Sequence, residues 1–178
     1  MNEPGASPPT PQPDETLKTA PVLQLASLAA RLLPLRLKRL FYRSPRLARL
    51  IRRELNRAAP QGYAVVQIAG GELAGLSMSL DLHAEKDYWL DTYEPELLLA
   101  LKELVKPGWV AYDLGANIGY ISLLLARLVG AEGRVFSFEA LPANLERLRL
   151  NVQLNALEER VTAIPGAVGN STEAVQFL

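Results

Sequence analysis

The second half of the chain alternates between two hydrophobic periods. Apolar residues recur every three or four positions in Glu94–Val105, which predicts a helix with Pro95 in its first turn. After Pro107-Gly108, short apolar runs alternate with further helical patterns. The predicted order is a strand at Trp109–Leu114, a helix at Ile118–Val129, a strand at Arg134–Glu139, a helix at Pro142–Leu154 and a strand at Val161–Ile164. This alternation predicts an α/β fold, a parallel sheet with crossover helices.

The first half of the chain follows other patterns. Residues 1–21 contain six prolines and few apolar side chains, so we expect a disordered leader. Leucines at helical spacing, interrupted at Pro34 and Pro45, predict two or three short amphipathic helices. Alternating apolar residues around Gly70-Gly71 predict a β-hairpin. The predicted divisions are a leader at 1–21, a helical stem at 22–60, a hairpin at 61–86 and the α/β region at 87–178.

Charge is distributed unevenly, although the formal net charge is zero. Residues 31–57 carry ten basic residues and one acid, whereas residues 58–178 carry eight basic and fifteen acidic residues, a net charge of −7. The basic stem has two interpretations. Residues 22–58 could make peripheral contact with anionic lipid or with nucleic acid, or they could form a solvated cap that packs its leucines on protein. Pro34 and Pro45 interrupt a long membrane-binding face, which favours the cap, and we do not expect a nucleic-acid partner.

Cysteine and histidine usage narrows the chemistry. The absence of cysteine excludes disulfides and thiolate metal sites, and the single histidine, His83, excludes zinc sites with two or three imidazoles. We therefore expect no metal site. The most apolar N-terminal run, Val22–Ala30, is far shorter than the roughly 20 residues of a membrane span. Because the acidic, proline-rich start also lacks the basic region of a signal peptide, we expect a cytoplasmic protein.

The candidate chemistry begins where the first predicted strand of the α/β region meets its helix. Gly115-Ala116-Asn117-Ile118-Gly119 joins the two elements, and glycines there let a ligand approach the backbone near the free N–H groups of a helix start. Asn117 stands where many such loops have a third glycine, and asparagine tolerates the left-handed conformation better than most residues. A glycine-containing turn is also typical of a tight connection in any α/β protein.

Two carboxylates make a ligand site the more specific interpretation. Asp113 precedes the loop, where its charge would repel a pyrophosphate and attract an ammonium group. Glu139 ends the next predicted strand, where a carboxylate can accept both hydroxyls of an adenosine ribose. This acidic pair suits a cationic cofactor with an amino-acid end and a nucleoside end.

A resemblance to a known family covers about residues 87–178. D-L-G-A-N-I-G-Y, then V-F-S-F-E-A-L-P-A-N-L-E-R-L-R-L-N-V-Q-L-N and A-V-G, with Y-E-P-E and V-K-P-G-W-V upstream, closely resembles the FkbM family of methyltransferases. The resemblance implies a Rossmann-like fold and S-adenosylmethionine as the cofactor. It places one group of residues around the methionine part of the cofactor: Asp113, Gly115, Ala116, Asn117 and Gly119. It also assigns Glu139 to the ribose, Ala140 and Leu141 to the adenine, and Gly166 and Ala167 to the lining of the adenine pocket.

Other polar and aromatic residues receive structural interpretations. The series Asn144, Asn151 and Asn155 matches the family, but we interpret it as helix surface and capping. Glu94 has two open interpretations, a carboxylate at the cofactor entrance or one at a helix start. We expect His83 at the surface or in a structural role. Three aromatics are interpreted as core or rim rather than as a substrate platform: Tyr88, Trp89 and Trp109.

The resemblance implies an enzyme that transfers a methyl group in line, and most members of the family are O-methyltransferases. We expect a hydroxyl of a small molecule or glycan as the acceptor. The catalytic residues stay unknown, because the acidic D-x-E-G-type segment that the family places in later strands does not occur. We therefore expect a fold truncated after its third core strand, with an open edge on the first, and a fragment that is poorly stable and inactive alone.

Two alternatives to a methyltransferase remain open at this point. The first is an NAD(P)-dependent oxidoreductase, which needs a G-x-G-x-x-G turn that G-A-N-I-G does not supply. The second is a non-catalytic module, either a remnant of a cofactor-binding fold or a scaffold bound through its basic stem. Retention of Asp113 and Glu139 argues against a decayed site.

Overall fold

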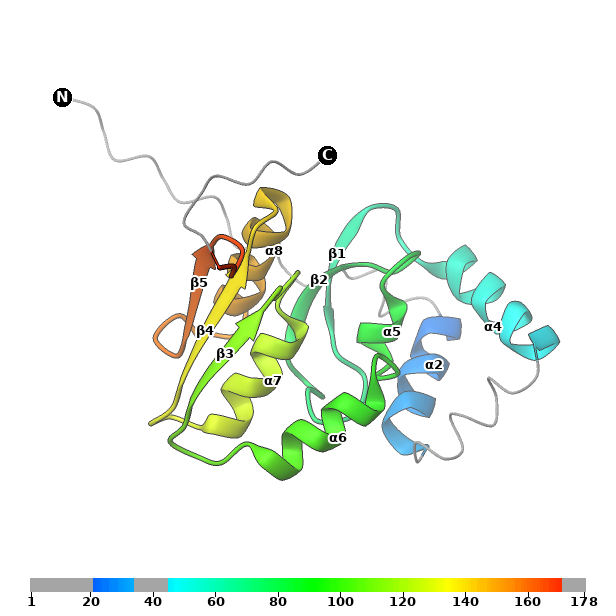
Figure 1. The fold of residues 1–178 in the computed structure, drawn as a ribbon. Coiled ribbons are helices and arrows are strands. Elements are labelled where there is room, and N and C mark those ends of the chain that lie inside the picture. The colour runs from blue at the N-terminus through cyan, green and yellow to red at the C-terminus, as the bar shows by residue number, and fades with distance from the viewer. Residues whose placement is uncertain (1–20, 34–44, 171–178) are drawn as a thin grey trace. The chain divides into compact units, whose positions relative to one another are not determined.

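The computed structural model of the chain describes residues 21–33 and 45–170. Residues 1–20 of the predicted leader and residues 34–44 of the predicted stem lie outside these residues, and Pro21 begins a helix. The chain divides into two compact units, Met1–Tyr93 and Glu94–Leu178, and each is described by itself. Figure 1 labels their helices and strands.

The first unit contains two helices followed by a two-stranded antiparallel sheet. Helix α2 (Pro21–Leu32) contacts helix α4 (Pro45–Ala58). Both helices begin at a proline, a residue that is favoured in the first turn. Strand β1 (Tyr63–Gln67) pairs with β2 (Ser77–Asp81), and the short helix α5 (Lys86–Trp89) contacts β2. The strands of the predicted hairpin are therefore present. The expected alternation is wrong, however, because three consecutive residues in the middle of each strand are buried.

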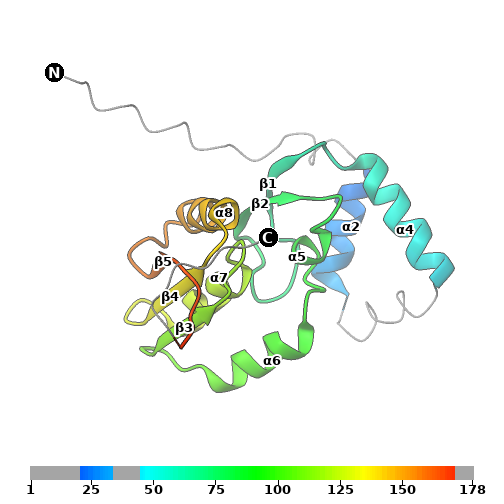
Figure 2. The same cartoon turned by 45° about the horizontal axis from the view of Figure 1, so that its top comes forward.

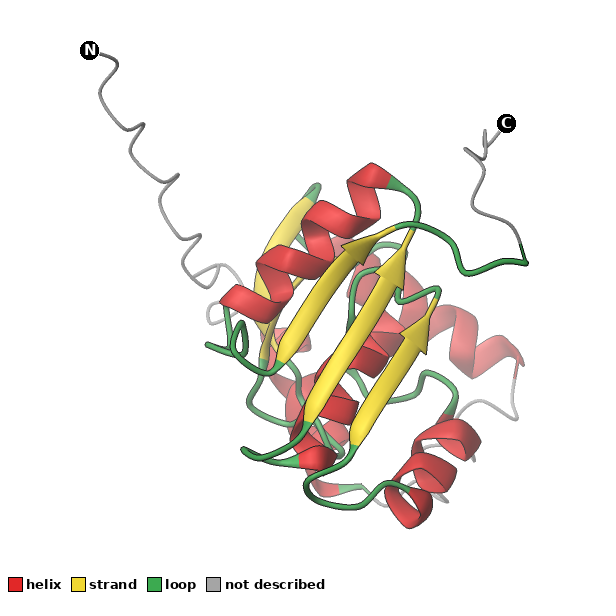
Figure 3. Cartoon of the chain, turned by 60° about the vertical axis from the view of Figure 1, so that its left-hand side comes forward, coloured by secondary structure: helices red, strands yellow, loops and turns green. Residues whose placement is uncertain are grey.

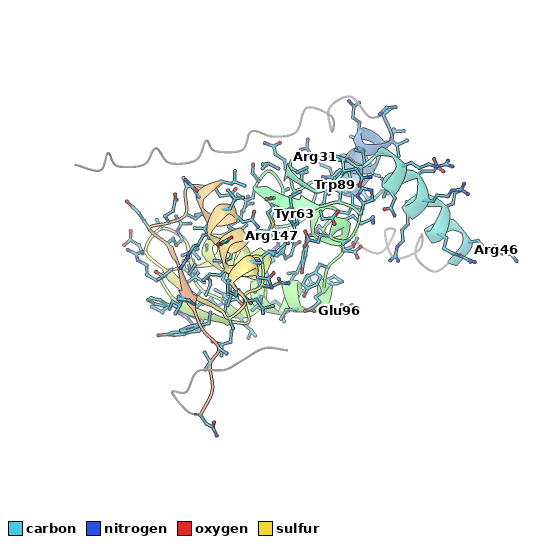
Figure 4. The ribbon with its side chains drawn as sticks, turned by 90° about the horizontal axis from the view of Figure 1, so that it is seen from above. Arg31, Arg46, Tyr63, Trp89, Glu96 and Arg147 are labelled. Atoms are coloured by element: carbon cyan, nitrogen blue, oxygen red, sulfur yellow. The ribbon has the colours of Figure 1, made fainter. Side chains whose placement is uncertain are left out.

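One glycine in the connection between β1 and β2 has no substitute. Gly71 has a φ of +70°, and a Cβ atom there would overlap the carboxylate of Asp91, itself buried. The aromatic residues beyond β2 divide as expected between core and rim. Trp89 is buried within this unit (Figure 4), and the rings of Tyr88 and Tyr93 pack against each other with centroids 4.5 Å apart.

Helices α2 and α4 differ in what they expose. On α2, Leu25, Leu28 and Leu32 are at least half exposed, while Leu23 and Ala30 on the other side are buried. On α4, Leu55 is buried and exposed arginines cover the opposite side, with Arg46 pointing outward at the helix start (Figure 4). The arginines of this side are Arg46, Arg49, Arg53 and Arg57. Within the described ranges, no helix is long and apolar enough to cross a membrane.

The second unit is a three-stranded parallel sheet with crossover helices, as the hydrophobic pattern predicts. After helix α6 (Pro95–Leu104), the elements run β3 (Val110–Leu114), α7 (Tyr120–Val129), β4 (Arg134–Glu139), α8 (Pro142–Gln153) and β5 (Val161–Pro165). The strand order is β3-β4-β5, shown side by side in Figure 3. Among the described strands, β3 therefore lies at an edge of this sheet, as the sequence predicts. The fold class is a Rossmann-like α/β arrangement.

One side of the parallel sheet forms the core of the second unit. Alternate strand residues such as Val135 and Ser137 are buried there, in the layer where α7 contacts β3 and β4 and α8 contacts β4 and β5 (Figure 2). The side chains of the other face are more open: Val110, Tyr112 and Leu114 on β3 are each more than half exposed. The core is built from aliphatic residues of both helices, of β4 and β5, and of the loop after β3: Ala116, Leu125, Ala126, Val129, Val135, Leu148, Val152 and Val161.

Candidate functional site

The loop between β3 and α7 adopts a conformation that only certain residues allow. Gly115, Asn117 and Gly119 all have positive φ, at +81°, +50° and +92°. Asn117 thus takes a positive φ, which asparagine tolerates better than most residues. Gly119 is the residue before the first turn of α7, and a Cβ atom there would lie 3.3 Å from Cγ of Leu148. At Gly115 the same atom would meet open space.

The end of strand β4 fixes the start of this loop. The backbone N–H groups of Gly115 and Ala116 both donate to the carbonyl oxygen of Phe138, each at 2.9 Å. A third bond, from Gly119 N–H to the carbonyl of Ala116 at 2.8 Å, closes the loop on itself. The loop is thus shaped by the backbone of the neighbouring strand before any ligand is considered.

The carboxylate of Glu139 joins two loops that are far apart in sequence. Its Oε2 accepts the backbone N–H of Asn117 at 2.8 Å, and its Oε1 accepts that of Leu141 at 2.8 Å. The residue is 7% exposed, so both bonds form in a largely dry environment where charge-assisted hydrogen bonds are strong. The carbonyl of Glu139 also accepts the N–H of Gly166 at 3.1 Å. Glu139 therefore contacts the loops that follow β3, β4 and β5.

Asp113 lies buried beside Glu139 at the same edge of the sheet. Its Oδ2 accepts the hydroxyl hydrogen of Ser122 at 2.6 Å, and Ser122 in turn accepts that of Ser137 at 2.9 Å. Burial raises the pKa of the Asp113 carboxyl above its ordinary value, the Ser122 hydrogen bond acts to lower it, and the charge of Glu139 raises it further. A cation placed between these two carboxylates would be favoured electrostatically.

The remaining predicted site residues follow the strand ends. Ala140 and Leu141 come directly after β4, and Gly166 and Ala167 come directly after β5. Of these four, Leu141 and Gly166 donate hydrogen bonds to Glu139, whereas Ala140 and Ala167 are assigned only because they follow the strand ends. The carboxyl ends of parallel strands are where ligands bind in sheets of this kind.

The surface role expected for one asparagine of α8 is wrong. Asn151 is fully buried, and its amide donates to the carbonyl of Ile118, in the loop before α7, at 2.8 Å. Asn155 caps the end of α8 as predicted, with its amide on the carbonyl of Asn151 at 2.7 Å. A signal existed in the sequence, since Asn151 adjoins the apolar positions Leu148 and Val152 on the helix.

Glu94 and His83, which the sequence analysis also considered, lie outside the loops that Glu139 joins. Glu94 precedes the first residue of α6, which agrees with a carboxylate at a helix start, and it has an unusual positive φ of 36°. His83 lies after β2 in the first unit, with Nδ1 3.5 Å from a carboxylate oxygen of Asp81. Its expected structural role fits that pairing. The residues with a part in the loop geometry that the sequence did not single out are Ser122 and Ser137.

Comparison with known proteins adds the chemistry. The family model described as the TRM5/TYW2 methyltransferase domain matches residues 75–177. No curated protein matches the chain. Similar solved structures include a putative rRNA-methylase from Clostridium thermocellum, 29% identical over 41% of this chain and 39% of that one, with a TM-score of 0.40. Another is an SAM-dependent O-methyltransferase from Thermotoga maritima, 31% identical over 38% of this chain and 26% of that one, with a TM-score of 0.36.

A third similar structure is Trm5 from Methanocaldococcus jannaschii in complex with adenosine, 15% identical over 60% of this chain and 30% of that one, with a TM-score of 0.43. The chain thus spans well under half the length of each of these proteins. The matched family is not the FkbM family that the sequence resembles, but both are families of methyltransferases. Because the match covers more than half of the chain, the chain belongs to the TRM5/TYW2 methyltransferase domain family, and S-adenosylmethionine is its cofactor as predicted.

Proposed function

We propose that this chain carries the cofactor-binding half of a methyltransferase whose acceptor is a hydroxyl group of a small molecule or glycan. The observation that supports the cofactor part of this proposal is the carboxylate of Glu139, which holds the loops after β3 and β4 together at the carboxyl edge of the sheet. A nucleoside lying across these loops would meet Glu139 with its ribose. Asp113, buried nearby, supplies a second negative charge at the loop start.

The donors and acceptors at this edge fit the two ends of S-adenosylmethionine. The amino-acid end carries an ammonium group, which suits Asp113, and the ribose carries two hydroxyls, which suit Glu139. We assign Gly115, Ala116, Asn117 and Gly119 to the methionine part. The residues that we assign to the adenine are those following the other two strands: Ala140, Leu141, Gly166 and Ala167. These assignments are the ones that the resemblance to the FkbM family implies.

When bound, the cofactor supplies a methyl group already activated by its sulfonium. The task of the described residues is then to bind and orient the cofactor so that an acceptor can approach the methyl group in line. A hydroxyl acceptor must also lose a proton, and we assign no residue of this chain to that role. The proposal of O-methylation rests on the FkbM resemblance, which the matched family leaves open.

A second candidate acceptor is RNA, and the observation that favours it is the arginine side of α4. Arg46, Arg49, Arg53 and Arg57 recur at helical spacing on the side opposite the buried Leu55. The single acid of this helix, Glu54, is paired with Arg57 at 3.1 Å, so it offsets only part of the charge. An arginine row of this kind suits a phosphate backbone and would bind it with strong salt dependence.

Isothermal titration of the 178-residue chain with S-adenosylhomocysteine and with NAD tests the cofactor assignment. We expect binding of the first and none of the second. Binding of NAD in place of S-adenosylhomocysteine would overturn the proposal and restore the oxidoreductase alternative. The non-catalytic alternative would be supported if neither ligand bound to a folded chain.

Filter binding of transfer RNA at low and high salt separates the two acceptor classes. Salt-sensitive binding that is lost when Arg46 and Arg53 are both replaced by glutamate would favour RNA over a small hydroxyl acceptor. The matched control replaces Arg134 and Arg149 of the second unit, which are also exposed. If transfer RNA does not bind, a hydroxyl group of a small molecule or glycan stays the proposed acceptor.

A further inference from the structure

Three side chains from three different elements form a buried line beside the candidate cofactor loop. Asp113 ends β3, Ser137 lies in the middle of β4, and Ser122 is in the first turn of α7. The parallel register places Asp113 directly beside Ser137, so both side chains point to the side of the sheet that α7 covers. Ser122 bridges them, accepting from Ser137 at 2.9 Å and donating to Asp113 at 2.6 Å.

The chemistry of the groups fixes the direction of these hydrogen bonds. An ionised carboxylate can only accept, so Ser122 must give its single hydroxyl hydrogen to Oδ2 of Asp113. The oxygen of Ser122 can then only accept from Ser137, which must donate. Both hydroxyl dipoles therefore point toward the carboxylate, and the two bonds polarise each other in the same sense.

Simple packing does not require this arrangement. Both serines are fully buried, and alanine would fill nearly the same space without a polar atom to satisfy. The bond from Ser122 to Asp113 has the short length of a charge-assisted O–H···O⁻ bond. The hydroxyls use Oδ2 of Asp113, so Oδ1 lies outside the line. The two serines thus stabilise the negative charge of the Asp113 carboxylate and also fix its rotation.

We propose that Ser122 and Ser137 are positioning residues that keep the buried Asp113 carboxylate ionised and oriented, with Oδ1 presented to the ammonium group of an amino-acid-bearing nucleoside. This inference rests on the proposed function for the ligand, but the effect of the serines on Asp113 does not. The serines do not touch the ligand themselves.

The surroundings of Asp113 explain why such support is needed. The elements packed against it are α7 and β4, whose titratable and charged groups are Tyr120 and Arg127 on the helix and Arg134 and Glu139 on the strand. Burial and the charge of Glu139 both act to raise the pKa of Asp113, and the Ser122 hydrogen bond is the influence that opposes them. Without the serines, the carboxyl would take up a proton at higher pH and lose its attraction for a cation.

The first test follows the carboxyl of Asp113 by NMR in the full chain without ligand, using ¹³C-labelled aspartate assigned with Asp113→Asn. We expect Ser122→Ala to raise the pH midpoint of Asp113, and Ser137→Ala to raise it less because its hydroxyl acts through Ser122. Ser79→Ala removes another buried serine, in the first unit, and should leave the midpoint unchanged. An unchanged midpoint in a folded Ser122→Ala chain would refute the positioning role.

The second test compares two ligands by calorimetry: S-adenosylhomocysteine, which carries the ammonium group, and methylthioadenosine, which does not. We expect Ser122→Ala to weaken S-adenosylhomocysteine by about tenfold near neutral pH, the effect of one charge-assisted hydrogen bond, and to leave methylthioadenosine unchanged. The loss should be partly recovered as the pH rises. Equal weakening of both ligands would show a merely structural role for Ser122.

The two tests separate this inference from the proposed function. A raised Asp113 midpoint in a chain that binds neither ligand would retain the serines' effect on the carboxyl and overturn the cofactor assignment. Normal binding of S-adenosylhomocysteine to Ser122→Ala and Ser137→Ala would retain the cofactor assignment and overturn the inference. Thermal unfolding of each variant beside Ser79→Ala identifies any chain that has failed to fold.

Discussion

Glu139 and Asn117 are 22 residues apart in sequence, and the carboxylate of one accepts the backbone N–H of the other at 2.8 Å. Asn117 is also the residue of the loop that takes the left-handed conformation without being glycine. The bond therefore holds the loop at its non-glycine residue of positive φ. The second oxygen of Glu139 binds the N–H of Leu141, so one side chain organises both loops.

Replacing Glu139 by glutamine should weaken cofactor binding and loosen the loop. An amide offers one acceptor oxygen, so only one of the two N–H groups can keep its partner. We expect a loss of roughly 1.5–3 kcal/mol in the binding free energy of S-adenosylhomocysteine, from Glu139→Gln or Glu139→Ala, measured by isothermal titration. Glu146→Gln on the exposed side of α8 is the control and should bind normally. Unchanged affinity in Glu139→Ala would contradict the ribose role.

Gly119→Ala should destabilise the second unit more than Gly115→Ala. Both residues have positive φ, so each substitution carries a backbone strain of about 1–2 kcal/mol. At Gly119 the added methyl group also meets Leu148 at 3.3 Å, whereas at Gly115 it meets open space. Urea unfolding of the two variants would measure the difference. Equal destabilisation would mean that Leu148 moves aside at no cost.

Stability should depend on pH through Asp113. Its pKa is raised in the folded chain, so the folded state binds more protons than the unfolded state between pH 3.8 and the raised value. Stability therefore falls as the pH rises through that window and is constant above it. Asp113→Asn should remove this fall, so the free energy of unfolding of the variant should rise relative to that of the wild-type chain as the pH approaches neutrality. The same substitution should weaken the binding of S-adenosylhomocysteine. Urea unfolding from pH 4 to about 8 tests the sign; a wild-type chain that gains stability relative to Asp113→Asn with rising pH would contradict it.

Asn151→Ala should destabilise the fold by about 1–3 kcal/mol, because the buried carbonyl of Ile118 loses its partner. The matched control is Asn144→Ala on the same helix, which is only half-buried and should change the free energy of unfolding by less than about 0.5 kcal/mol. Chemical denaturation of both variants gives the comparison. Similar small effects would show that water replaces the Asn151 amide.

The limits of sequence reasoning follow a physical division. Periodicity gave the strands and helices of the second unit to within about two residues, because their burial patterns are local. Asparagine chemistry allowed the positive φ of Asn117 but did not require it. The Ser137–Ser122–Asp113 line was not predictable, since it depends on the register of β3 against β4 and on the packing of α7. Asn151 was misjudged because a polar residue on an apolar helix face needs a tertiary partner that local patterns do not reveal.

The family assignment has a similar limit. The loop D-L-G-A-N-I-G-Y and Glu139 indicate a methyltransferase fold in either family. The match to a methyltransferase domain family confirms this fold. The acceptor depends on residues that these elements do not include. The FkbM resemblance, the hydroxyl acceptor, the cytoplasmic location and the lipid or packing role of residues 22–58 stay predictions.

Hydrogen exchange of the 178-residue chain with and without S-adenosylhomocysteine tests the central claim most directly. We expect the ligand to slow exchange in the segments 113–119 and 139–141, and to do so much less in Glu139→Gln. Strands β1 and β2 serve as the internal reference. Slowed exchange confined to other segments, or no change at saturating ligand in a folded chain, would contradict the assignment of the cofactor to Asp113–Gly119 and Glu139.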